Sequence, residues 1–413
     1  MPEQYDKPFL PFRDFVDSLS RASHADLLRI PFSRIRDEDA FAELRQHLID
    51  IYAGAEVLHS FMADNGHVFD CIPAERQPAL KRTGQKPAPP PASPPPELGE
   101  SASYAAAALV EFDANRKDRF GNPMQCPPGT VPIRRVTLEE ISRFGTLLRY
   151  RQKAPLGRER HPRLSPPALG AAGHRYAIGS QAVASIGGHC AIGIWDPPVQ
   201  GDAFSLAQVW CATRAPVQTV ECGWQVWPSR YGDARPILFV YWTADGYQTT
   251  GSYNSSDFVQ QSQTIAPGAP LTTVSSPGGQ QFEIDIAWQL VSGNWWLYVN
   301  RQSVGYFPGS LFQGGPLAAG ATELDFGGET YTTGAWPPMG SGAFANGGAG
   351  NTAYARDVYF FPAAGGAQPA ALAGSQTSAA CYTSLTGAAA PPWNTFVFFG
   401  GPGGADCGAG LTT

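Results

Sequence analysis

The chain has no histidine after His189, so the last 224 of its 413 residues contain none. A Ser-His-Asp or Cys-His mechanism housed wholly in that part of the chain is therefore excluded, as is a histidine-ligated zinc site. Carboxylates are the acid–base groups that remain there. Just four of them are glutamates from residue 161 onward, namely Glu221, Glu283, Glu323 and Glu329.

Lysine is also scarce. From residue 161 onward the chain has no lysine and seven arginines, against thirteen acidic residues. The formal net charge of -6 supplies no basic field to hold phosphates, so we expect no nucleic acid partner. A surface with few cations gains little positive charge on acidification, which limits self-repulsion and indicates a secreted protein that works in acid.

No apolar run approaches the length of a membrane span, and the segment 1–10 has no signal-peptide core, so we expect no membrane partner. The seven cysteines lack the CxxC pairs of a zinc ribbon. Their pattern indicates disulfides with one cysteine left over, hence an oxidising, extracellular compartment.

The N-terminal part has a mixed α/β pattern. Asp37 can cap a helix over 38–54, in which Phe41, Leu44 and Leu48 recur on one face. Asp64-Asn65-Gly66 predicts a hairpin turn before a short strand at 67–72. The proline-rich stretch 86–97 predicts an extended insertion.

From about residue 170 the sequence changes to short apolar runs broken by Gly, Pro, Asn and Asp, which is typical of antiparallel sheet. Ten tryptophans and 23 phenylalanines can fill a two-sheet sandwich. The prediction is a mainly β chain, with an antiparallel β-sandwich after a mixed α/β region. The clearest strands are 203–211, 220–227, 236–243, 281–288 and 295–300.

Several short motifs occur in one order along the chain and together resemble the neprosin family of glutamic peptidases. In the C-terminal half they are Glu221-Cys222-Gly223-Trp224-Gln225, Tyr241-Trp242-Thr243-Ala244-Asp245-Gly246-Tyr247, Gly293-Asn294-Trp295-Trp296, Gly327-Gly328-Glu329 and Met339-Gly340-Ser341-Gly342. In the N-terminal half, Asp70-Cys71-Ile72 with Gln77-Pro78-Ala79, and the run from Cys126 to Arg135, match the family's activation peptide.

This resemblance implies a zymogen of a prolyl endopeptidase that acts on proline-containing peptides and is inhibited by its own prodomain until acid removes it. The prodomain would cover 1–160 and the catalytic domain 170–413, with the cut between 155 and 172. The resemblance also implies the catalytic pair Glu221 and Glu329, and disulfides joining Cys71 to Cys126 and Cys381 to Cys407.

Strand alternation agrees with the choice of Glu221. A strand over 220–227 places Glu221, Gly223 and Gln225 on one face, so a packed Trp224 turns Glu221 outward into a solvent-facing groove. The small residues Gly223, Gly327 and Gly328 leave room for a substrate backbone. Gln225, Tyr241 and Trp295 are candidate substrate-binding residues, while Glu283 and Glu323 are expected on the surface.

Two neighbouring carboxylates tend to share one proton, so the pair can supply both a base and an acid. This chemistry needs no cofactor, metal or covalent intermediate. Paired carboxylates and aromatic residues also suit a glycoside hydrolase, and the β texture alone suits a carbohydrate-binding module. Both remain alternatives.

Hairpin arithmetic predicts a third disulfide. A turn centred on Pro216-Val217 would set Cys211 opposite Cys222, within bonding range, and leave Cys190 free.

Overall fold

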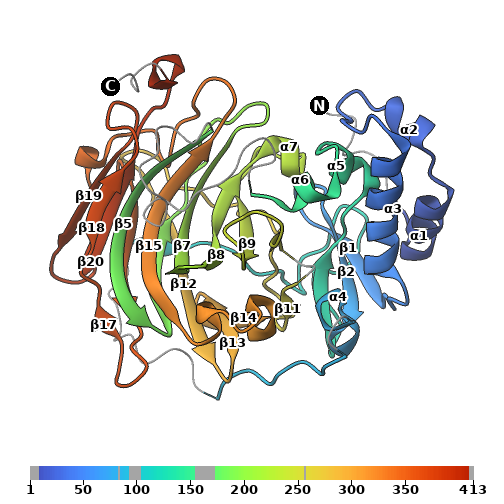
Figure 1. Ribbon diagram of the computed structural model, residues 1–413, viewed down its shortest axis with the longest axis horizontal. Coiled ribbons are helices and arrows are strands. Elements are labelled where there is room, and N and C mark those ends of the chain that lie inside the picture. Colours follow the sequence, from blue (N-terminus) through green and yellow to red (C-terminus); the bar gives the residue numbers. More distant parts are fainter. Residues whose placement is uncertain (1–8, 82–83, 93–103, 154–172, 255–256, 409–413) are drawn as a thin grey trace.

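In the computed structural model the chain has two parts, an N-terminal helical region and a large β-sandwich (Figure 1). The structure describes residues 9–81, 84–92, 104–153, 173–254 and 257–408. The expected cut between 155 and 172 and most of the proline-rich insertion lie outside the described residues.

The N-terminal region packs its helices against a small antiparallel sheet of β1, β2 and β4. Asp37 caps α3 by accepting a hydrogen bond from the backbone N–H of Ala40, and Phe41, Leu44 and Leu48 are buried, so the predicted helix is confirmed. The predicted hairpin joins β1 to β2. The elements are α1 (Phe12–Arg21), α2 (His24–Leu28), α3 (Glu38–Tyr52), β1 (His59–Met62), β2 (Val68–Pro73), α4 (Pro78–Lys81), β3 (Ala106–Ala107), β4 (Thr130–Arg134), α5 (Leu138–Ser142) and α6 (Leu147–Arg151).

The rest of the chain confirms the mainly β prediction with two antiparallel sheets. The first has the order β10-β9-β8-β7-β15-β5-β18. Its strands are β5 (His174–Ser185), β7 (Phe204–Arg214), β8 (Val217–Val226), β9 (Ile237–Thr243), β10 (Ser252–Tyr253), β15 (Ala321–Tyr331) and β18 (Ala373–Gln376), with α7 (Pro228–Tyr231) between β8 and β9. We call it the site sheet because both candidate glutamates lie on it.

The second sheet runs β11-β14-β13-β12-β6-β16-β20-β19, with β17 on β16 and β3 on β12. Its inward side chains, such as Trp288 and Trp295, pack against those of the site sheet, such as Val209 and Trp224, in one hydrophobic core. The strands are β6 (Gly187–Gly193), β11 (Val259–Gln260), β12 (Phe282–Val291), β13 (Asn294–Val299), β14 (Gln302–Pro308), β16 (Ala353–Phe360), β17 (Gln368–Pro369), β19 (Thr383–Ala388) and β20 (Thr395–Gly400).

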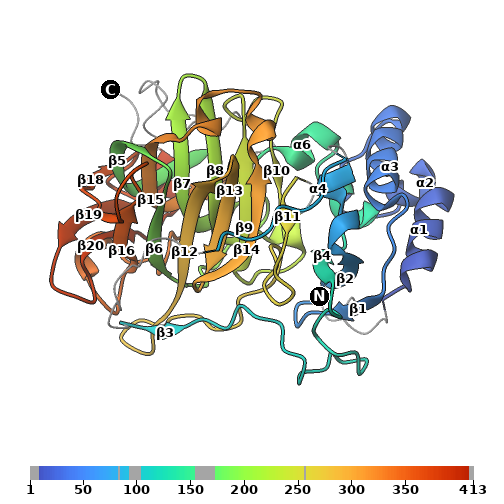
Figure 2. The same cartoon turned by 90° about the horizontal axis from the view of Figure 1, so that it is seen from below.

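The N-terminal region is attached to the sandwich at several places. β3 pairs in parallel with the start of β12 (Figure 2). Ala108 and Val110, just after β3, join the sandwich core. Earlier in the chain, the side-chain amide of Gln77 forms two hydrogen bonds with the backbone of Gln260. Its oxygen accepts from the N–H at 2.6 Å, and its nitrogen donates to the carbonyl at 3.0 Å. The motif Gln77-Pro78-Ala79 therefore serves the contact between the two parts.

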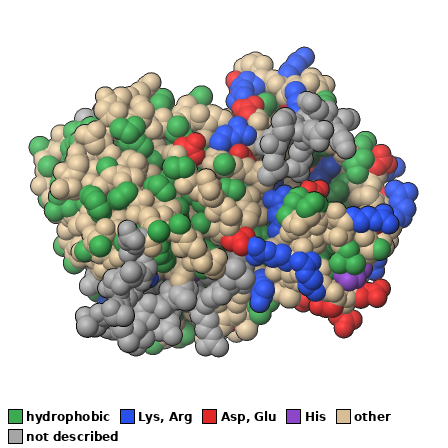
Figure 3. Space-filling model, turned by 90° about the horizontal axis from the view of Figure 1, so that it is seen from above, with side chains coloured by type: hydrophobic (Ala, Val, Ile, Leu, Met, Phe, Trp, Pro, Cys, Tyr) green, Lys and Arg blue, Asp and Glu red, His purple; other side chains and the backbone are tan. Residues whose placement is uncertain are grey.

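Charge is divided between the two parts as the sequence predicts. Lysine and arginine side chains gather over the N-terminal region, whereas the visible face of the sandwich is mostly apolar or uncharged (Figure 3). In the described residues, no helix is both long enough and apolar enough to cross a membrane.

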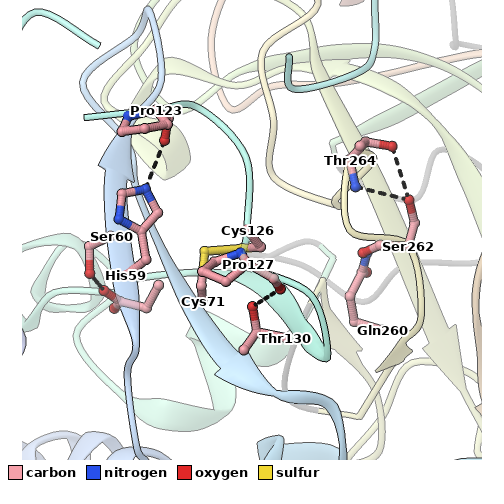
Figure 4. The surroundings of a disulfide bond; sticks show 11 residues. His59, Ser60, Cys71, Pro123, Cys126, Pro127, Thr130, Gln260, Ser262 and Thr264 are labelled. Carbon is pink, nitrogen blue, oxygen red and sulfur yellow. Dashed lines mark hydrogen bonds between the residues drawn. A yellow bond between two sulfur atoms is a disulfide. The ribbon is translucent and has the colours of Figure 1, made fainter. Parts of the chain in front are cut away.

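Two disulfides are present, Cys71–Cys126 and Cys381–Cys407, the pairings that the family resemblance implies. The first ties β2 to the loop before β4 inside the N-terminal region (Figure 4).

The third expected bridge is wrong: Cys211, Cys222 and Cys190 are free and buried. The β7–β8 turn consists of Ala215 and Pro216, one residue earlier than predicted, so Cys211 lies opposite Val220 and Cys222 opposite Val209.

Candidate active site

Glu221 and Glu329 lie on β8 and β15, which are separated in the site sheet by β7. Glu221 is opposite Trp210 of β7, and Glu329 is opposite Leu206 of the same strand. Because Cys222 and Trp224 point into the sandwich core, Glu221 projects from the other face. The alternation thus brings both glutamates to the face that the N-terminal region covers.

Small residues lie between the two glutamates. Gly223 and Gly327 flank Gln208 in one row across β8, β7 and β15. A Cβ atom on Gly223 would stand 1.9 Å from the carbonyl oxygen of Ala207, so this position requires glycine. Gly328 differs from the expectation: it faces the core, where a Cβ atom would meet the Met339 sulfur at 2.6 Å.

Lys153, at the end of the N-terminal region, inserts its side chain between the two glutamates. Its Nζ atom lies 2.6 Å from Oε2 of Glu221 and 2.8 Å from Oε2 of Glu329. All three side chains have 0% exposure. The ammonium also lies 5.2 Å from the ring centroid of Trp210. One cation therefore neutralises two buried carboxylates that would otherwise repel each other.

Each glutamate has its own further partners. Oε1 of Glu221 accepts hydrogen bonds from the hydroxyls of Thr219, at 2.7 Å, and Tyr247, at 2.8 Å. Oε1 of Glu329 lies 2.7 Å from Nδ1 of His174, and its Oε2 accepts a 3.3 Å hydrogen bond from the amide of Gln208. The two carboxylates thus sit in different environments, one supplied by hydroxyls and the other by nitrogen donors.

The charges around Glu329 decide its ionisation. Burial acts to raise the pKa of this carboxyl, but the ammonium of Lys153 and the contact with His174 outweigh burial and hold the pKa below its ordinary value. Glu329 is therefore a carboxylate in the covered state.

Of the three residues expected to bind substrate, two lie near the glutamates and one does not. Tyr241 lies opposite Glu221 on β9, and Gln225 follows on the same face of β8, where it contacts the hydroxyls of Tyr231 and Tyr253. Trp295 is wrong for this site. It belongs to the other sheet and points into the core, where its indole donates to the carbonyl of Leu317.

Aromatic side chains extend the site along the sheet toward α7. Phe144 of the N-terminal region packs edge-on against Trp227 at a centroid distance of 5.9 Å. The guanidinium of Arg230 lies over the rings of Tyr150 and Tyr253 and donates to the carbonyl oxygen of Tyr150 at 3.0 Å. The segment from Phe144 to Lys153 therefore covers a continuous surface that ends at the two glutamates.

Burial in the structure differs from the sequence expectations. Glu221 was expected in a solvent-facing groove, but the N-terminal region covers both Glu221 and Glu329 completely. Glu283 and Glu323 are also buried rather than on the surface, because they form salt bridges with Arg356 and Arg214.

Sequence reasoning missed Lys153, His174, and the hydroxyl groups of Thr219 and Tyr247. Tyr247 belongs to a recognised motif, which was a usable signal. Lys153 is the last lysine in the chain, but its partners depend on how the two parts pack. Among the described residues, no group of three or more His, Cys, Asp or Glu side chains has an arrangement that could hold a metal ion.

The chain was compared with solved structures and with protein-family models. Against solved structures, the chain shows 14% identity to sheep galectin-11 in complex with glycerol, covering 41% of this chain and 96% of that one, with a TM-score of 0.21. It shows 10% identity to CG-16, a homodimeric agglutinin from chicken liver, covering 38% and 92%, with a TM-score of 0.21. Likenesses of this size carry no argument.

The matches to family models identify the family of the chain. The model for neprosin matches residues 201–402, which contain both glutamates, and the model for the neprosin activation peptide matches residues 60–180, which contain Lys153. The chain belongs to the neprosin family and carries that family's activation peptide.

Proposed function

We propose that the chain is the zymogen of a secreted, acid-acting glutamic endopeptidase that cleaves peptides at proline, with Glu221 and Glu329 as its catalytic carboxylates. Family membership and the activation peptide support the coarser part, a peptidase made as a zymogen. The finer part rests on the site itself.

One observation carries the proposal: a single buried ammonium, that of Lys153, bridges Glu221 and Glu329. Burying two carboxylates close together is unfavourable, so a fold keeps such a pair only with compensation. Here the compensation comes from the part of the chain that a zymogen removes. Loss of Lys153 would leave two adjacent carboxylates at the floor of an opened cleft.

Such a pair holds one proton over a range of acid pH. The ionised member takes a proton from water as the water oxygen bonds to the scissile carbonyl carbon. The protonated member gives its proton to the amide nitrogen as the C–N bond breaks. One carboxylate ends protonated and the other ionised, so the pair is regenerated.

The aromatic surface of Trp227, Tyr231 and Tyr253 supports the choice of proline. Flat rings pack well against a pyrrolidine ring, and the amide of Gln225 stands among them to bond a substrate backbone. In the zymogen, Phe144 and Tyr150 occupy this surface.

The topology of the site sheet supports a prodomain boundary that lies before β5. β5 pairs with β15 from His174 to Ser185, in the interior of the site sheet, so it must stay with the catalytic domain. We place the prodomain at 1–160 and the cut between 155 and 172, before this strand.

The test is incubation of the full chain at about pH 3 to 5 with a proline-rich peptide, reading the cleavage positions by mass. Wild-type protein should cut at proline, and Glu221→Gln and Glu329→Gln should lose nearly all activity. The double variant should be hardly worse than either single one. Glu323→Gln is the matched control, since Glu323 is equally buried and lies on the strand of Glu329. Full activity in the Glu221→Gln or the Glu329→Gln variant would remove that residue from the mechanism. We call these two glutamates the dyad.

A further inference from the structure

We propose that His174 is a positioning residue of the dyad, which orients Glu329 and keeps it ionised, so that the shared proton resides on Glu221. The proposal rests on the proposed function for its meaning in catalysis, but it concerns a contact that stands independently of activity. Nδ1 of His174 lies 2.7 Å from Oε1 of Glu329, and both side chains are fully buried.

His174 is built into the catalytic sheet. It begins β5 and lies opposite Tyr331 of β15, which is two residues along that strand from Glu329. Gly173 lets the chain enter here, since a Cβ atom at that position would stand 2.5 Å from the Tyr331 ring. Because β5 is an interior strand, His174 remains beside Glu329 when the prodomain leaves, whereas Lys153 departs.

Aromatic rings fix the imidazole. Tyr176 stacks on it, with ring planes 13° apart, while Tyr331 and Phe204 close two further sides at centroid distances of 4.8 and 5.9 Å. Its Nε2 atom is buried without a hydrogen-bond partner among the described residues. Packing therefore holds the ring so that Nδ1 meets the carboxylate.

Among the described residues, the charged and titratable side chains that contact His174 are Glu329 on β15, the phenols of Tyr176 and Tyr331, and Arg175, which donates to the carbonyl oxygen of His174 at 3.1 Å. Lys153 contacts the other oxygen of Glu329. In acid a histidine is a cation, and an opposite charge at this distance favours the ionised carboxylate. Once Lys153 is gone, His174 still contacts Glu329 through Nδ1.

The partners of the two glutamates differ in a way that assigns the proton. A protonated imidazole and the amide nitrogen of Gln208 can only donate, so they suit a carboxylate. The hydroxyls of Thr219 and Tyr247 can donate or accept, so they suit Glu221 whether it is ionised or protonated. Glu329 is then poised as the base and Glu221 as the acid.

The test compares His174→Asn with wild type. Asparagine can still donate to Glu329 from nearly the position of Nδ1, but it cannot carry the charge. We expect the acid limb of the pH profile of kcat/KM to move to higher pH by about one unit. His189→Asn is the matched control, because His189 is equally buried and lies 2.7 Å from Asp285 in the other sheet. Its profile should stay where it is.

A second readout does not need activity. The full-length chain is labelled with carbon-13 at the glutamate side-chain carboxyl carbons, and carbon NMR follows the titration of Glu329. The Glu329 signal is identified as the one that is missing from the Glu329→Gln variant. His174→Asn should raise that midpoint by about one pH unit. An unmoved midpoint, or a fall in kcat with both limbs unmoved, would overturn the proposal. A wild-type protein that cleaves nothing would instead refute the proposed function, leaving the titration to decide this point.

Discussion

Lys153 and Glu221 form a salt bridge of 2.6 Å in which neither side chain touches solvent. Lys153→Met keeps the length of the side chain and removes the charge, so the two buried carboxylates would repel each other beneath the prodomain. We expect faster maturation, beginning at higher pH, measured as loss of intact mass over time. Arg29→Met is the control, because Arg29 is 81% exposed and its salt bridge is with Asp26, within the N-terminal region. Maturation at the wild-type rate and pH would contradict the inhibitory role of Lys153.

Tyr247 donates one of two hydrogen bonds to Oε1 of Glu221. Tyr247→Phe removes a single oxygen atom and leaves the bond from Thr219. A lost hydrogen bond to a reacting group should lower kcat/KM about tenfold. Tyr298→Phe, a buried tyrosine in the other sheet, should leave kcat/KM unchanged. Equal kinetics in the two variants would show that Tyr247 does not act on the dyad.

Acid should loosen the prodomain in two pH windows. At the interface, Nε2 of His67 lies 2.7 Å from the carbonyl oxygen of Tyr231. Burial, together with the charge of neighbouring Arg134, holds the pKa of His67 below its ordinary value of 6.5, although Glu140 and Asp233 oppose this. The neutral ring therefore stabilises the docked state fully above pH 6.5, and this contribution is lost as the pH falls. The depressed pKa of Glu329 adds a second loss below its ordinary value of 4.5.

His67→Gln tests the first window. The glutamine amide can still donate to Tyr231 but cannot be protonated, so the pH of half-maximal maturation should fall. His59→Gln is the control, because His59 bonds to Pro123 within the N-terminal region. A maturation curve identical to wild type would rule out His67 as a sensor of acid.

Three cysteines should react as free thiols. Cys190, Cys211 and Cys222 are buried, and burial raises the pKa of each thiol, so native protein should resist alkylation. Unfolding without a reductant should add three labels per chain, counted by mass. A single label would mean that two of these thiols are bonded to each other, contrary to the strand register.

The candidate pair Glu221 and Glu329 could be located from the sequence because short motifs mark both glutamates, and strand alternation predicts the direction in which Glu221 points. The covered state could not. Lys153 and Glu329 are far apart in the sequence, and their contact depends on how the two parts of the chain pack together. The error at Cys211 has a local cause, since a hairpin turn one residue earlier shifts the paired residues. Trp295 was misplaced because alternation says that a side chain alternates, but not which sheet carries the site.

The pairing of β3 with β12 has a consequence for how inhibition ends. Ala106 and Ala108 donate backbone hydrogen bonds to Gln281 and Glu283, at 3.1 and 2.8 Å, and Val110 is buried in the sandwich core. A cut between 155 and 172 would break the chain without breaking these contacts. The cleaved protein would then be a non-covalent complex, and the N-terminal region could leave only after the hydrogen bonds between β3 and β12 break. Because this dissociation is a first-order step, activity should appear after a lag that does not depend on protein concentration.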